Sequence, residues 1–171
     1  MRNLSYALLF GILITGFSST ALAQTGGTIK IKLYFAKADP DADNEVYAVE
    51  RTIKKTARVA EAALRELLKG VSEEDRKKGL ASSYEVGDIV TGREECASGK
   101  IKPLRTYLIG VTIRRGVAIV NFRPEAECYL QSAAFAMARV MNPIDATLKQ
   151  FKTIKRVEYA LNGKIITEWD A

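Results

Sequence analysis

Histidine is absent from the 171-residue sequence, which contains two cysteines and 20 aspartate and glutamate residues. Without histidine, no Ser-His-Asp triad or Cys-His pair can form, and no imidazole can act as a general base. Two cysteines without histidine also exclude the tetrahedral zinc sites that Cys and His build together. Any catalysis would therefore depend on carboxylates, lysine, tyrosine or a bound cofactor.

Paired carboxylates are the remaining candidates for chemistry. Glu94 and Glu95 are adjacent, and Glu125 lies two positions before Glu127. A glycosidase needs two carboxylates on opposite sides of a cleft, and adjacency in the sequence does not provide that separation. The three aspartates of segment 39–43 lack the glycine and the distal glutamate of an EF-hand loop, which indicates an acidic turn. We predict no catalytic, cofactor-binding or metal site.

The N-terminal segment, residues 1–23, has the pattern of a secretory signal peptide. Arg2 supplies positive charge, residues 4–17 are an apolar run, and Ala21-Leu22-Ala23 is an A-x-A cleavage signature. The run is too short for a permanent transmembrane helix. We expect cleavage after Ala23 and export to the periplasm or the extracellular cell envelope, with retention as an anchor as the alternative. Residues 24–171 then form one domain.

Export determines how the two cysteines are interpreted. Disulfides persist outside the cytoplasm, and an even cysteine count leaves no spare thiol. Cys96 lies in an irregular insertion at about residues 81–106, which glycine and proline interrupt, and Cys128 follows the last strand before a predicted helix. We predict a disulfide between them, which pins the insertion to the domain; two free thiols are the alternative.

Export also determines which partners suit a formal net charge of +6. Outside the cytoplasm the anionic partners are wall polymers, lipid head groups and acidic protein faces, so we predict no nucleic-acid binding. The best candidates for contact with such a partner are Arg114 and Arg115 at a predicted hairpin tip, together with Lys152, Lys155 and Arg156 before the final predicted hairpin. Solvated turns are the alternative interpretation of these five residues.

The elements that must position these residues follow from hydrophobic periodicity. β-rich or alternating runs predict strands at residues 29–35, 46–51, 107–113, 117–122, 157–161 and 164–169. Apolar residues at steps of three and four predict helices at residues 53–71 and from about 130 to 151. Pro143 interrupts the second helix, which is therefore either kinked or split into two. The order β-β-α-loop-β-β-α-β-β indicates the α+β class, with one mostly antiparallel sheet and two helices on one face.

Five segments, in this order and at this spacing, resemble the GerMN domain, which is named after a sporulation and spore-germination protein. They are Val49–Arg51, Glu66–Gly70, Gly116–Phe122, Ala146–Phe151 and Val157–Lys164. The resemblance extends from about Ile29 to Ile166. It implies a fold similar to the ring-building motifs of secretion and sporulation complexes. It also implies an envelope module that assembles through protein–protein contacts and carries no catalytic residue set.

We therefore expect a non-enzymatic, exported cell-envelope protein that binds a protein partner or associates weakly with itself. One alternative is a small periplasmic hydrolase that acts on wall glycan through paired carboxylates. Another is a basic scaffold that binds anionic wall polymer. Two carboxylates facing each other across a cleft would favour the hydrolase, and an uncovered sheet edge or apolar patch would favour assembly.

Overall fold

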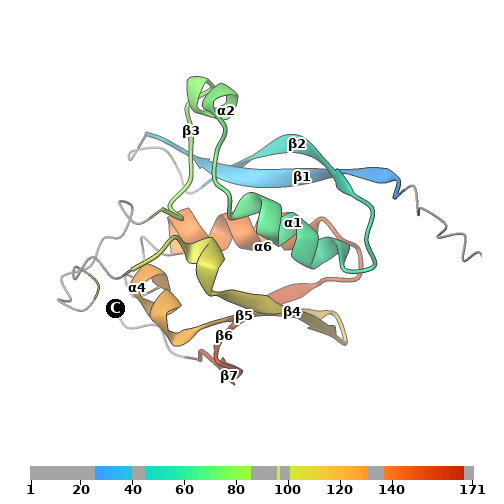
Figure 1. Ribbon diagram of the computed structural model, residues 1–171, viewed down its shortest axis with the longest axis vertical. Coiled ribbons are helices and arrows are strands. Elements are labelled where there is room, and N and C mark those ends of the chain that lie inside the picture. The colour runs from blue at the N-terminus through green and yellow to red at the C-terminus, as the bar shows by residue number, and fades with distance from the viewer. Residues whose placement is uncertain (1–25, 40–44, 86–95, 97–100, 131–136, 168–171) are drawn as a thin grey trace, which may run out of the picture.

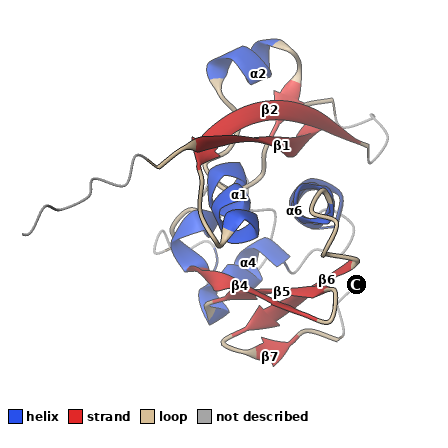
Figure 2. Ribbon diagram, turned by 90° about the vertical axis from the view of Figure 1, so that its right-hand side faces the viewer, coloured by secondary structure: helices blue, strands red, loops and turns tan. Residues whose placement is uncertain are grey.

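The computed structural model describes residues 26–39, 45–85, 96, 101–130 and 137–167. Two sheets enclose a layer of helices (Figure 1 and Figure 2). The first sheet has the strand order β2-β1-β3 and the second has the order β4-β5-β6-β7. The strands are β1 (Thr28–Lys37), β2 (Val46–Lys54), β3 (Leu80–Ala81), β4 (Leu108–Arg114), β5 (Val117–Phe122), β6 (Arg156–Leu161) and β7 (Lys164–Ile165).

The helical layer consists chiefly of α1 and α6, which lie between the two sheets (Figure 2). The α-helices are α1 (Val59–Leu67), α2 (Glu73–Lys77), α4 (Glu127–Leu130) and α6 (Asn142–Lys149). Short 3₁₀ turns occur at Leu104–Tyr107 and Pro124–Ala126, and a π-helical turn, Met137–Met141, leads directly into α6. None of the described helices is long and apolar enough to cross a membrane.

Strand β1 is the centre of the first sheet. Its alternating pattern buries Ile31, Leu33 and Phe35 against the helices. Strand β2 pairs with one edge of β1 over its whole length, whereas β3 pairs only with the last two residues of the other edge. Helix α6 and the residue after it cover the middle of that edge: Thr147 Oγ1 accepts a hydrogen bond from the Tyr34 N–H at 3.1 Å, and Gln150 Oε1 accepts one from the Lys32 N–H at 2.9 Å. This part of the edge is therefore closed to other strands.

The second sheet contains two tight hairpins and one parallel pair. Arg115 and Gly116 join β4 to β5, and Asn162 and Gly163 join β6 to β7; all four have positive φ. A two-residue turn with positive φ at both positions has the same twist as the two strands that it joins. The Asn-Gly pair in the sequence predicts such a turn. Strands β5 and β6 run parallel because the segment containing α6 connects them.

The α+β class is confirmed, but the arrangement of the sheets needs a correction. The sequence predicts one sheet with both helices on one face, whereas the strands form two sheets on opposite faces of the helical layer. Leu33 and Phe35 of the first sheet and Val120 and Phe122 of the second are all almost completely buried in one core. A helical layer that is apolar on both faces must be covered on both, which one sheet cannot do.

Several predicted boundaries also change. The helix expected over 53–71 spans only Val59–Leu67, because β2 continues to Lys54. The break predicted at Pro143 takes the form of the π-helical turn, since proline donates no hydrogen bond to the preceding turn. Residues 131–136 of the predicted second helix and the predicted signal peptide lie outside the described residues.

Candidate interaction site

Four of the five predicted contact residues belong to two segments that the fold brings together. Arg114 and Arg115 lie at the β4–β5 turn, and Lys152 and Lys155 lie in the loop between α6 and β6. The carbonyl of Gly116 accepts hydrogen bonds from the backbone N–H groups of Lys155 at 2.7 Å and of the fifth predicted residue, Arg156, at 3.2 Å. We call this surface, made of Arg114, Arg115, Lys152, Lys155 and Arg156, the basic end.

Glycine is required where these two segments meet. Gly116 has a φ of 81°, and a Cβ at this position would lie 3.3 Å from Cγ of Lys155 and 3.8 Å from the Thr153 carbonyl oxygen. A side chain here would be strained by the backbone conformation and crowded by the neighbouring loop. The two basic segments can therefore pack closely because residue 116 has no side chain.

The charge of the basic end is largely uncompensated. All five side chains are exposed. Arg156 forms an ion pair with Glu158 at 2.6 Å, but Arg114, Arg115, Lys152 and Lys155 form no ion pair with any described residue. Four positive charges without counter-charges in the described part of the chain make this surface attractive to an anionic partner.

A pocket of about 260 Å³ opens beside the basic end. Its walls come from the start of α1, from one face of β4 and from the chain just after α6. Ile113, which directly precedes the basic turn, lines the pocket and is 43% exposed. The full set of lining residues is Ala57, Arg58, Val59, Ala60, Glu61, Val111, Ile113, Phe151 and Thr153.

Glu61 fixes the wall of this pocket. The residue is only 8% exposed, and its carboxylate pairs with Arg58 at 2.5 Å and with Arg65 at 2.8 Å. It also accepts a hydrogen bond from the Val111 N–H of β4 at 3.5 Å. Two guanidinium groups and one amide thus compensate the buried carboxylate and tie α1 to β4.

The predicted carboxylate pairs do not form a catalytic arrangement in the described part of the chain. Glu125 and Glu127 are both exposed on short helical turns, and neither lines the pocket. Glu94 and Glu95 lie outside the described residues, as does the acidic segment 40–44. Within the described ranges, no three Cys, Asp or Glu side chains lie close enough together to hold a metal ion.

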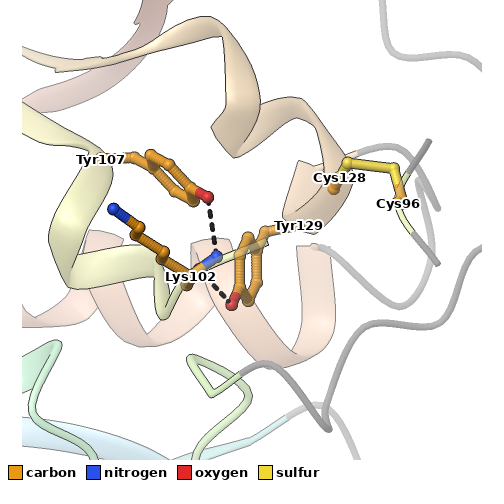
Figure 3. Close-up of a disulfide and its surroundings, with 5 residues drawn as sticks. All are labelled: Cys96, Lys102, Tyr107, Cys128 and Tyr129. Carbon is orange, nitrogen blue, oxygen red and sulfur yellow. Dashed lines mark hydrogen bonds between the residues drawn. A yellow bond between two sulfur atoms is a disulfide. The ribbon is translucent and has the colours of Figure 1, made fainter. Parts of the chain in front are cut away.

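A disulfide and two tyrosines hold the insertion near the start of β4, at the other end of that strand from the basic turn (Figure 3). Cys96 and Cys128 form a disulfide, with Cα atoms 5.6 Å apart. The backbone N–H of Lys102 donates to the Tyr107 hydroxyl at 2.7 Å, and the Tyr129 hydroxyl donates to the Lys102 carbonyl at 2.9 Å. Both tyrosine rings are buried, so residue 102, near the end of the insertion, is fixed to the core.

Three of these features do not emerge from the sequence. In the sequence, Glu61 occupies an ordinary polar position of an amphipathic helix. Only its burial in the structure reveals that it joins α1 to β4. Tyr107 and Tyr129 have no spacing that would predict a common contact with Lys102. Ile113 belongs to an alternating strand, which predicts burial rather than exposure. The two arginines that follow Ile113 are the one local signal in the sequence near the pocket.

Two mostly antiparallel sheets around a helical layer define a small α+β domain with an exposed basic end. The family model for Germane, described as sporulation and spore germination, matches residues 32–167. The chain therefore belongs to this family, as the ordered motifs predict.

Solved structures of GerMN domains are similar to this chain. The tandem GerMN domains of the sporulation protein GerM from Bacillus subtilis match with a TM-score of 0.50 and 22% identity. That match covers 85% of this chain but 43% of the tandem structure, so this chain spans less than half of its length. The first GerMN domain of the same protein matches with a TM-score of 0.48 and 20% identity over 82% of this chain and 87% of that domain. No functionally curated protein matches the chain.

Proposed function

We propose that this protein is a non-enzymatic, exported cell-envelope protein that binds an acidic face of a partner protein through its basic end. One observation carries the proposal. Two basic segments, distant in the sequence, meet through the hydrogen bonds of the Gly116 carbonyl and present four cations without counter-charges among the described residues. Complementary charge of this kind steers association and selects the partner.

Export is supported by the cysteines and by the N-terminal pattern. A disulfide such as that between Cys96 and Cys128 persists in oxidising compartments and is rare in the cytoplasm. The signal-peptide pattern of residues 1–23 is consistent with the same compartment. We propose a mature chain that starts at Gln24 and forms a single GerMN-like domain, with the insertion at about residues 81–106 tied down by the disulfide.

A binding role is favoured over hydrolysis by what the surface contains. The chain has no histidine, and Glu125 and Glu127 are exposed rather than placed across the pocket. A hydrolase acting through two carboxylates needs a cleft between them. A purely polyanion-binding scaffold would need the cations but not the partly apolar pocket that opens beside them.

The test compares two variants that each remove four positive charges. The first carries Arg114→Gln, Arg115→Gln, Lys152→Gln and Lys155→Gln. The matched control carries Lys69→Gln, Arg76→Gln, Lys77→Gln and Lys78→Gln; the last three lie on or beside α2, beyond the first sheet (Figure 2). The tagged full chains, produced with their own N-terminal segment, are used to capture proteins from envelope extracts, and the captured proteins are quantified by mass spectrometry.

We expect a protein that is retained by the wild type and by the control variant but lost from the basic-end variant. Its retention should weaken when salt is raised from about 0.05 to 0.5 M, because exposed charges are screened. Equal capture by both variants would refute the role of the basic end. Sedimentation of the wild type with purified wall polymer, combined with no captured protein, would favour the scaffold instead.

A further inference from the structure

The pocket lies where the helical layer ends. Ala57 and Arg58 line it just before α1 begins, and Phe151 and Thr153 line it just after α6 ends. On β4, Val111 is buried by the helices, whereas Ile113, two residues along the same face, is left open. One apolar wall of the interior is therefore accessible from outside at this end of the molecule.

Cations adjoin the lining residues in the sequence, and one cation lines the pocket itself. Ile113 is followed directly by Arg114 and Arg115, and Lys152 separates the two lining residues that come after α6. Arg58, at the start of α1, is the one cation that lines the pocket, and it is paired with Glu61 at 2.5 Å. The first turn of that helix has no side-chain cap, so its N–H groups add partial positive charge to the same wall.

Negative charge in the pocket wall is already compensated. Glu61 is the one acidic residue that lines the pocket, and its carboxylate pairs with Arg58 and Arg65 and accepts from the Val111 N–H. An incoming carboxylate therefore meets cations and amides without an opposing free carboxylate in the wall. The pocket is smaller than the 300–1,000 Å³ usual for small-molecule sites, at about 260 Å³. Its size suits one large side chain.

We propose that the pocket binds an acidic segment of a partner protein that inserts a single apolar side chain against Ile113, Val111 and Phe151. This inference rests on the proposed function and specifies the chemistry of the partner. The basic end attracts the acidic residues of the segment and sets the rate of encounter, whereas burial of the apolar anchor supplies affinity that salt does not screen. Charge and pocket together distinguish such a segment from a plain polyanion.

The probe is a fluorescein-labelled ten-residue peptide of glutamate and serine with one central leucine. Its controls are the same peptide with alanine at the centre and a polyglutamate of equal charge. Binding to the full chain is measured by fluorescence anisotropy at two salt concentrations. Two protein variants form a matched pair on β4: Ile113→Ser removes the pocket wall, and Ile109→Ser changes a residue that is equally exposed, at 45%, but does not line the pocket.

We expect the leucine peptide to bind the wild type and the Ile109→Ser variant roughly tenfold more tightly than the alanine peptide. The Ile113→Ser variant should lose this preference and still bind both peptides weakly. Ala57→Phe provides a second variant, because Ala57 is an exposed pocket residue whose enlargement fills the pocket without disturbing the core. It should abolish the preference even if Ile113→Ser fails to fold.

Equal binding of the leucine, alanine and polyglutamate probes would overturn the inference and assign the surface to polyanions. Self-association of the wild type that Ile113→Ser abolishes would overturn it in favour of a second copy of the chain. Neither result alters the envelope-capture comparison, which tests the basic end alone. If capture fails to depend on the basic end, the proposed function fails whatever the peptides do.

Discussion

Removing the disulfide between Cys96 and Cys128 should lower the free energy of unfolding by about 3.5 kcal/mol. The two cysteines are 32 positions apart, and cross-linking a loop of that length removes conformational entropy from the unfolded chain. The folded domain should survive the loss, because Tyr107 and Tyr129 still hold the backbone of Lys102. The loss in free energy of unfolding should therefore remain close to the value expected from the loop length.

The assay is urea unfolding of the wild type and of the double variant Cys96→Ala, Cys128→Ala, followed by circular dichroism. A loss of about 3.5 kcal/mol corresponds to a fall in melting temperature of roughly 10 °C for a domain of this size. Wild type unfolded in reductant is the matched control, since it loses the same cross-link without a change of sequence. The two samples should agree closely.

The reasoning also makes a direct chemical prediction. Alkylation of the exported protein without reductant should modify neither cysteine, and alkylation after reduction should modify both. Two alkylated cysteines without reductant would show that the bond does not form in the exported protein. A double variant that loses less than about 1 kcal/mol would show that the cross-link does not restrict the unfolded chain as the loop length implies.

Two further predictions concern buried polar groups. Burial acts to raise the pKa of Asp75, but hydrogen bonds from Ser72 and the Arg51 guanidinium outweigh it and lower the pKa below the ordinary 3.8. Asp75→Asn should therefore cost about 3 kcal/mol at pH 7. The stabilisation by the carboxylate is complete well above the unfolded-state pKa and is lost as the pH falls through the lower folded-state value. Urea midpoints between pH 7 and pH 2 should consequently fall less for the variant than for the wild type, and parallel curves would contradict this. Tyr84→Phe should raise the free energy of unfolding by about 1 kcal/mol, because the Tyr84 hydroxyl is fully buried and has no hydrogen-bond partner within the described ranges. A destabilised Phe variant in the same urea assay would show that the hydroxyl is satisfied.

Local patterns determined the class and the individual elements of this protein. The alternation of Ile31, Leu33 and Phe35 predicts a strand because side chains alternate between the two faces of a sheet. The Asn162-Gly163 pair predicts its hairpin because both positions need positive φ, which the structure has. Such signals depend on residues a few positions apart and need no knowledge of the rest of the chain. The family motifs differ in this respect, because their order and spacing extend over most of the chain.

Tertiary structure decided how these elements are combined. The pairing of strands, such as the parallel pair β5 and β6, depends on which surfaces of α1 and α6 remain to be covered. The hydrophobic periodicity of a single segment does not identify its partner. The same packing brings the Arg115-Gly116 turn next to Lys155 and leaves Ile113 open at the end of the helical layer. The sequence alone predicted the basic residues as separate candidates. Only the long-range contacts of the two sheets with one shared core made them a single surface beside a pocket.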